Sequence, residues 1–204
     1  RKIAFKDRMI RKGEWNLHSN QLNHRMKGAV LGLIGYGAIA KRFHEKTSAF
    51  GFSKVLVYDP FIKREIITNK GASPTDLNIL LSESDYISIH VPLNDTSKKM
   101  IGEKQLNLMK KNSILINTSR GGVIDQQALI DTLQKKQIAG AGLDVFEKEP
   151  IPNNSPLLKL DNVTLSDHTG WYSEESLKEL KTKAAINVLA VLKGGQPIYP
   201  VNNL

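Results

Sequence analysis

The chain reads, from Ala29 to Ala40, Ala-Val-Leu-Gly-Leu-Ile-Gly-Tyr-Gly-Ala-Ile-Ala. The apolar run Ala29–Ile34 predicts a buried strand, and the helix-period segment Ile39–Phe50 predicts a helix. Between them lies a G-x-G-x-x-A pattern, in which the first glycine permits a tight turn, the second lets an anion approach the backbone, and the alanine keeps helix and strand close. This strand–turn–helix context predicts a dinucleotide-binding turn. Its expected cofactor-binding residues are Gly35, Tyr36, Gly37, Ala38 and Ile39.

A carboxylate follows the next predicted strand. Asp59 comes directly after the Val- and Leu-rich segment Lys54–Tyr58. A carboxylate at this position can accept hydrogen bonds from both ribose hydroxyls of an adenosine and repels a 2′-phosphate, which favours NAD over NADP. Lys63 and Arg64 lie close enough in sequence to temper that preference. The alternative interpretation is a glycine turn and a surface aspartate in some other α/β protein.

The rest of the chain alternates strands with helices. Four further strands are predicted at Tyr86–His90, Ser113–Asn117, Ala139–Val145 and Val163–Ser166. Helices are predicted at Ser73–Leu81 with Ser73 as N-cap and Pro74 in the first turn, at Lys104–Met109, at Gln126–Gln134 after the cap Asp125, and from the cap Ser173 to the Gly194-Gly195 stop. Six strands in this alternation predict a Rossmann-type, doubly wound parallel sheet of the α/β class.

Composition narrows the class of protein. The 204 residues include no cysteine, which excludes a disulfide framework and a zinc–thiolate site, and no long apolar run or signal peptide predicts a membrane span or export. A cytoplasmic location is therefore expected. The net charge is +9, and eight Lys/Arg against two acids place +6 of it in residues 1–27. No aromatic interleaving accompanies this charge, so nucleic-acid binding is disfavoured. His18, His24 and His44 show no metal-ligand spacing and are expected at the surface, and no metal site is predicted.

Three later stretches carry motifs. Asn117–Asp125 reads Asn-Thr-Ser-Arg-Gly-Gly-Val-Ile-Asp, Ala141–Pro150 reads Ala-Gly-Leu-Asp-Val-Phe-Glu-Lys-Glu-Pro, and Asp167–Trp171 reads Asp-His-Thr-Gly-Trp. In this order they resemble the D-isomer-specific 2-hydroxyacid dehydrogenase family, over about Arg11–Asn202. The resemblance implies an NAD-dependent oxidoreductase that moves a hydride between nicotinamide and C2 of a small D-2-hydroxy or 2-keto acid, such as glycerate/hydroxypyruvate, glyoxylate, lactate or phosphoglycerate.

The resemblance also implies roles for particular residues. Arg120 would grip the substrate carboxylate, because a guanidinium offers a planar fork of donors. His168 would be the acid/base, and Glu149 would hydrogen-bond it and favour its charged form. Asp144 would hold the nicotinamide carboxamide. The other expected cofactor contacts are Pro60, His90, Val91, Pro92, Thr96, Thr118, Ser119 and Gly170, together with Arg120 and His168 themselves.

Each of these residues also has a structural interpretation. Arg120 could be a surface ion-pair partner, Glu149 could shape a loop before Pro150, His168 could be a loop histidine, and Asp144 could cap a strand turn. For His90 a structural or adenine-side role is preferred over catalysis. Trp171 either walls the substrate pocket or packs against the last helix.

Departures from the family pattern leave the activity open. Asp167 stands where the family usually has proline, and residues 168–174 are closer to the corepressor-like branch. An NAD(H)-sensing corepressor-like protein is therefore an alternative to the dehydrogenase. The segments are assigned as a hinge and dimer helix at 1–27, with Trp15 as an interface anchor, an NAD-binding domain at 28–172, and a C-terminal helix and tail at 173–204. The resemblance implies a homodimer.

The substrate domain of the family is built mainly from an N-terminal lobe. This chain does not contain that lobe, and Arg1 follows no methionine, so a natural or engineered fragment is expected. Such a fragment is expected to bind NAD but to turn over poorly or not at all, because lobe closure excludes water and brings donor and acceptor together. A truncated, inactive dehydrogenase is therefore a further alternative.

Overall fold

A computed structural model describes residues 2–15 and 23–200 of the chain. The chain divides into two compact units, Arg1–Asp167 and His168–Leu204. His18 lies outside the described residues. The sheet and its covering helices belong to the first unit, and the long C-terminal helix belongs to the second.

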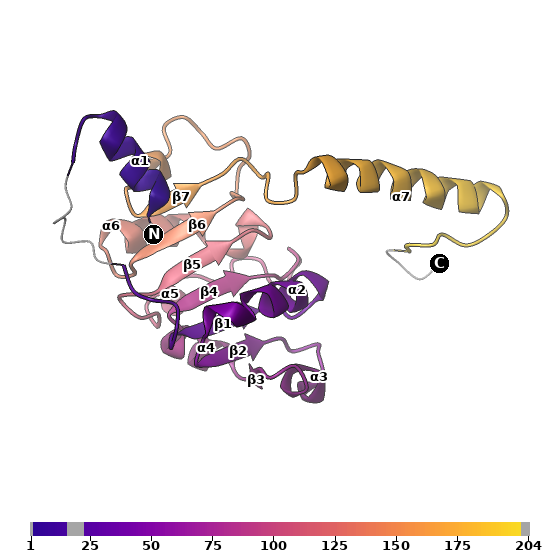
Figure 1. Cartoon of the computed structure of the whole chain (residues 1–204), viewed down its shortest axis with the longest axis horizontal. Coiled ribbons are helices and arrows are strands. Elements are labelled where there is room, and N and C mark those ends of the chain that lie inside the picture. Colours follow the sequence, from indigo (N-terminus) through magenta and orange to yellow (C-terminus); the bar gives the residue numbers. More distant parts are fainter. Residues whose placement is uncertain (1, 16–22, 201–204) are drawn as a thin grey trace. The chain divides into compact units, whose positions relative to one another are not determined.

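The first unit is built on a parallel sheet of seven strands in the order β3-β2-β1-β4-β5-β6-β7 (Figure 1). Their bounds are β1 Val30–Ile34, β2 Lys54–Tyr58, β3 Ser73–Pro74, β4 Tyr86–Ile89, β5 Ile114–Asn117, β6 Gly140–Leu143 and β7 Val163–Leu165. Because every strand runs the same way, all their carboxyl ends meet at one edge of the sheet. The strand order reverses at β1, which is where open α/β sheets bind their ligands.

Helices cover both faces, because the central strands are apolar on both sides. The helical segments of the first unit are α1 Ile3–Arg11, α2 Ala38–Thr47, α3 Arg64–Thr68, α4 Leu77–Glu83, α5 Glu103–Leu106 and α6 Gln126–Gln134, with single 3₁₀ turns at Ser48–Phe50, Gly121–Val123 and Pro156–Lys159. Leu31 and Leu33 of β1 pack in one core with residues of α2 and α3. Ile34 of β1 packs in a second core with residues of α4, α5 and α6. The doubly wound parallel sheet predicted from the sequence is thus confirmed.

Several predicted elements are confirmed almost to the residue. The strand Lys54–Tyr58 and the helix Gln126–Gln134 have the expected bounds, and the Asp125 carboxylate accepts a hydrogen bond of 3.2 Å from the Ala128 N–H. In the second unit, α7 spans Glu174–Leu192, and the Ser173 hydroxyl accepts a bond of 3.0 Å from the Ser176 N–H. No residue of α7 is buried, although its apolar side chains recur at helical spacing.

The segment Ser73–Leu81 was predicted wrongly as one helix. Ser73–Pro74 instead forms the edge strand β3, paired with β2, and the helix begins at Leu77 after Asp76. Proline suits both positions, because it lacks the N–H that a helix leaves unpaired in its first turn and that an edge strand directs to solvent. The short helix α3, with Ile67 buried, was not predicted.

Among residues 2–15 and 23–200, no helix has the length and apolar character that crossing a membrane requires.

Candidate functional site

The glycine turn joins β1 to α2 at the carboxyl edge of the sheet. Gly35 has a φ of +88°, and a Cβ there would lie 2.8 Å from Val91 Cγ1 and 2.9 Å from the His90 carbonyl oxygen. Its N–H donates a hydrogen bond of 2.8 Å to the Tyr58 carbonyl. Only glycine fits both this backbone conformation and this space, so Gly35 lets β1 leave the sheet against the exit of β4.

Gly37, unlike Gly35, is surrounded by open space. It precedes α2 as its N-cap and no side chain caps the helix; apart from its chain neighbours, no atom of residues 2–15 and 23–200 lies within 4 Å of where its Cβ would be. Ala38 and Ile39, which follow it, are exposed, and Ala40 is fully buried against the sheet. The first-turn N–H groups have no partners within the helix, and this open glycine gives an anion room to reach them. The residues present therefore fit a pyrophosphate.

Asp59 is fixed at the end of β2 beside the glycine turn. One carboxylate oxygen accepts a hydrogen bond of 2.7 Å from the Tyr36 N–H, and the other accepts one of 2.9 Å from the Phe61 N–H. Each carboxylate oxygen can accept a further bond, so Asp59 keeps acceptor capacity for ribose hydroxyls. Pro60, which follows it, is exposed.

The side chain of Tyr36 lies inside the protein. It is fully buried, and its hydroxyl forms a hydrogen bond of 2.8 Å with His44 Nδ1. Any contact of Tyr36 with a cofactor therefore comes from its backbone. His44, which was expected at the surface, is only partly exposed on α2, and burial lowers its pKa.

His90 packs between β4 and α2. Its ring lies 5.4 Å from the Phe43 ring, centroid to centroid, and its Nε2 is buried without a hydrogen-bond partner among the described residues. Burial lowers the pKa of His90 to about 4, so the imidazole is neutral at physiological pH. From the sequence a structural or an adenine-side role was expected; this packing favours the structural one, and a contact with the cofactor stays a prediction.

The loop that follows β4 carries the next expected contacts. Val91 is half-buried and Pro92 is exposed. The Asn94 side-chain oxygen accepts hydrogen bonds from the Thr96 N–H and hydroxyl at 3.0 and 2.8 Å. These bonds hold Thr96 in a turn, and Thr96 is exposed.

A buried asparagine shapes the loop that follows β5. Asn117 is 1% exposed; its Nδ2 donates a bond of 3.0 Å to the Arg120 carbonyl, and its Oδ1 accepts bonds of 3.0 and 2.9 Å from the Ser119 N–H and hydroxyl. The Arg120 guanidinium is exposed and donates to the Ser119 carbonyl at 2.7 Å. Thr118 is exposed in the same loop. Asn117 thus holds the backbone that presents Arg120, a role that was not predicted from the sequence.

Asp144 follows β6 and is 5% exposed. Its N–H donates a hydrogen bond of 3.0 Å to the Asn117 carbonyl. Its carboxylate accepts a hydrogen bond of 2.6 Å from the hydroxyl of Ser166, a residue that follows β7. Sequence reasoning missed Ser166, because nothing in the strand pattern indicates that the exits of β6 and β7 meet. Glu149 lies further along the same loop, where one carboxylate oxygen accepts a bond of 2.9 Å from the Phe146 N–H.

His168 opens the second unit. It is half-buried and has a φ of +60°, a left-handed conformation uncommon outside glycine. The Thr169 carbonyl accepts a bond of 2.9 Å from the Tyr172 N–H, and the rings of Trp171 and Tyr172 meet edge to face at 5.2 Å. Gly170, which lies between Thr169 and Trp171 in the sequence, is exposed. The structure places Arg120 and Glu149 on neighbouring strand exits of the first unit, whereas their meeting with His168 stays a prediction.

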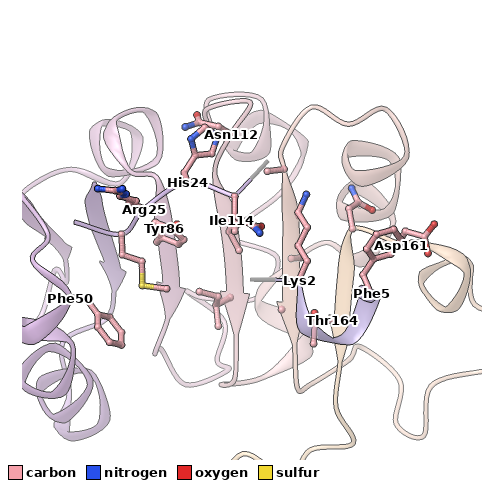
Figure 2. A pocket seen from close by; sticks show the side chains of 18 of the residues that line it. Lys2, Phe5, His24, Arg25, Phe50, Tyr86, Asn112, Ile114, Asp161 and Thr164 are labelled. Carbon is pink, nitrogen blue, oxygen red and sulfur yellow. The ribbon is translucent and has the colours of Figure 1, made fainter. Parts of the chain in front are cut away.

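A groove of about 750 Å³ lies apart from these residues, over one face of the sheet (Figure 2). Its floor includes Ile114, Ile116 and Gly142, and the basic residues Lys2, His24, Arg25 and Lys27 line it together with Asp161. None of the expected site residues lines it. Trp15 is 79% exposed, and its role in a dimer stays a prediction.

The fold, the glycine turn and the carboxylate after β2 define a dinucleotide-binding domain of the Rossmann type. Residues 1–170 match the family described as D-isomer specific 2-hydroxyacid dehydrogenase, NAD binding domain. The chain therefore belongs to the D-isomer specific 2-hydroxyacid dehydrogenase family, as its motifs predicted, and NAD is the cofactor of the matched domain.

Known proteins resemble the chain along nearly its whole length. It is 43% identical over 208 residues to a glyoxylate reductase of Thermococcus litoralis and 40% identical over 205 residues to one of Korarchaeum cryptofilum; each alignment covers 99% of this chain and 62% or 61% of the relative. The solved structure of D-lactate dehydrogenase with NAD+ from Lactobacillus jensenii has a TM-score of 0.88 at 30% identity, and the match covers 100% of this chain and 64% of that one. The chain thus spans less than two thirds of the length of these relatives.

Proposed function

We propose that the chain is the cofactor-binding part of an NAD-dependent oxidoreductase, which transfers a hydride between nicotinamide and C2 of a small D-2-hydroxy or 2-keto acid. The observation that carries this proposal is the gathering of Gly37, Asp59, Asp144 and Arg120 at the exits of neighbouring parallel strands, in a chain that belongs to the D-2-hydroxyacid dehydrogenase family. A homodimer and a cytoplasmic location, both expected from the sequence, are parts of the same proposal.

The chain's own residues would hold NAD along the carboxyl edge of the sheet. The first turn of α2, opened by Gly37, would bind the pyrophosphate, and Asp59 would accept bonds from the adenosine ribose. Asp144, aligned by Ser166, would accept a bond from the nicotinamide carboxamide. When bound, NAD supplies the hydride acceptor, and NADH supplies the donor. A 2′-phosphate would meet the Asp59 carboxylate, which supports NAD over NADP.

The substrate would be held by its carboxylate. The exposed guanidinium of Arg120, on a loop fixed by Asn117, offers paired donors to a planar anion. Because the fork binds a carboxylate and an adjacent carbonyl oxygen together, it suits a 2-keto acid. The names of the relatives support glyoxylate as the first substrate to test.

The proton would be carried by His168. During reduction its imidazolium would donate a proton to the carbonyl oxygen of the keto acid as the hydride arrives at C2, and during oxidation the neutral ring would take that proton back. Glu149 would accept a hydrogen bond from the ring, fix its tautomer and favour the protonated form.

The test uses the complete gene product. Glyoxylate, hydroxypyruvate, pyruvate and phosphohydroxypyruvate are each offered with NADH, and its oxidation is followed by absorbance. We expect turnover with at least one, and His168→Ala should lower kcat by about two to four orders of magnitude, the usual range for general acid–base catalysis. The Kd for NADH should change little, since the cofactor is held mainly by the first unit.

Two outcomes would contradict the proposal. If the protein binds NADH but oxidises it with none of the four acids, the NAD(H)-sensing alternative replaces it. If His168→Ala retains full turnover, the acid/base role of His168 is wrong.

A further inference from the structure

The loops that follow β5 and β6 touch through their backbones. A Cβ at Gly121 would overlap the carbonyl carbon and oxygen of Phe146 and would lie 2.5 Å from the Glu147 nitrogen. Gly121 follows Arg120 directly. The absence of a side chain at this position therefore brings the Arg120 loop into direct contact with the loop that carries Glu149.

Phe146 joins this contact to Glu149. Its carbonyl group lies against Gly121, while its N–H donates the hydrogen bond of 2.9 Å to a Glu149 carboxylate oxygen. The Phe146 side chain is 9% exposed and packs in the larger core, so the peptide unit has little freedom to move. One fixed residue thus stands between the Arg120 loop and the Glu149 carboxylate.

A reciprocal pair of hydrogen bonds closes the same contact on its outer side. The Gln126 N–H donates to a Glu147 carboxylate oxygen at 3.2 Å, and the Glu147 N–H donates to the Gln126 side-chain oxygen at 3.2 Å. The Lys99 ammonium lies 3.1 Å from Asp125 and 3.6 Å from Glu147. Lys99 is half exposed, so these ion pairs add little, and the main constraint is the close fit at Gly121.

We propose that Gly121 is a positioning residue that sets the separation of Arg120 and Glu149 through the Phe146 peptide. The inference rests on the proposed function, in which Arg120 binds the substrate and Glu149 partners the acid/base His168. Any side chain at position 121 must push residues 146 and 147 away, and this displacement moves the N–H that holds Glu149.

The expected effect falls on the chemical step. If Glu149 is displaced, it no longer orients His168, so kcat falls, whereas NADH is held mainly by other residues and its Kd stays the same. A purely structural role for Gly121 would lower the amount of folded enzyme and leave kcat per folded molecule unchanged.

The experiment compares Gly121→Ala with Gly102→Ala in the complete gene product. Position 102 has room for a Cβ, since the nearest atoms lie 3.8 Å away. Gly121→Ala should lower kcat for glyoxylate reduction by about tenfold to hundredfold, as expected for a misplacement near 1 Å. It should leave the Kd for NADH unchanged. Gly102→Ala should match the unmodified protein in both.

A second variant keeps the proposal testable if Gly121→Ala does not fold. Gln126→Leu removes one hydrogen bond of the outer pair without crowding the contact, and it should lower kcat by about two- to fivefold with the Kd for NADH unchanged. If the active protein keeps its kcat in Gly121→Ala, or in Gln126→Leu when Gly121→Ala does not fold, the positioning role is overturned and the proposed function stands. An unmodified protein without turnover overturns the proposed function, and the inference with it.

Discussion

At the scale of single residues, the two glycines of the fingerprint serve different ends. Gly35 has a positive φ, and its missing Cβ makes room for the exit of β4, so the fold itself requires it. Gly37 has an ordinary extended backbone with open space around it, so the fold does not need it. The sequence motif presents both as one signal, whereas in the structure the fold requires Gly35 and leaves open space beside Gly37.

The two glycines can be separated by substitution. Gly35→Ala should lower the free energy of unfolding by about 2 kcal/mol or more, because a left-handed alanine is strained and also collides with His90 and Val91. Gly37→Ala should change stability by less than about 0.5 kcal/mol and weaken NADH binding by about tenfold or more, because a methyl group would occupy the space an anion needs. Urea unfolding and fluorescence titration with NADH measure the two effects. Equal losses of stability in both variants would contradict this division.

His90 makes stability depend on pH. Its pKa falls from 6.5 in the unfolded chain to about 4 in the folded protein because burial disfavours the charged ring. The unfolded state therefore binds more protons between these values, so stability is complete above about pH 6.5 and falls as the pH drops towards 4. The maximum loss is roughly 3 kcal/mol.

Replacing His90 with phenylalanine tests this dependence. His90→Phe keeps a ring against Phe43 and removes the titrating group, so the loss of stability between pH 7 and pH 4.5 should shrink by about 2 to 3 kcal/mol. Urea unfolding at several pH values measures the difference. His44 and the carboxylates titrate in both proteins and cancel in the comparison. Parallel curves for the two proteins would show that His90 is not the cause.

At the scale of elements, the loop after β5 is organised by one buried side chain. Asn117→Ala removes three hydrogen bonds and should lower the free energy of unfolding by about 2 to 3 kcal/mol, since backbone groups near Arg120 lose their partners. Asn94→Ala is a matched control, because Asn94 makes the same kind of turn in an exposed loop, and it should cost less than about 1 kcal/mol. Chemical denaturation would refute this ranking if Asn94→Ala were the more damaging change.

Periodicity and capping predicted most elements, and they failed where tertiary pairing decides. The strand Lys54–Tyr58 and the helix capped by Asp125 follow from local sequence alone, and so do their bounds. Ser73–Pro74 carries the same local signals as a helix start, but β2 recruits it as a strand. A strand of two residues is too short to show an alternating hydrophobic pattern, so it can be recognised only by its pairing with β2.

The candidate site shows the same division. Motifs placed Arg120, Asp144 and Glu149 on strand exits, and the first unit has them there. Ser166 and Gly121 could not be recognised, because their importance lies in what they face across a loop: the Asp144 carboxylate for one and the Phe146 peptide for the other. The reactive side chains can be recognised from the sequence, whereas the residues that align them can be recognised only from how the loops pack.

At the scale of the whole molecule, both hydrophobic cores lie within the first unit. Every described core residue falls between Val30 and Leu165, and α7 buries none. Residues 1–167 should therefore fold without the C-terminal helix, with a melting temperature within about 5 °C of that of the 204-residue chain. Thermal unfolding followed by circular dichroism measures this. A control that ends at residue 138 loses Ala141, Leu143 and Val163 from the core and should not fold cooperatively.

The two ends of the sheet have a consequence in concentrated solution. In the described chain the outermost strands are β3, of two residues including Pro74, and β7, of three. Exposed strand edges template pairing between molecules, and natural proteins blunt them by shortening them or by placing proline there. The protein's shortest strands stand where longer ones would invite a neighbouring chain to add to the sheet and seed fibrils.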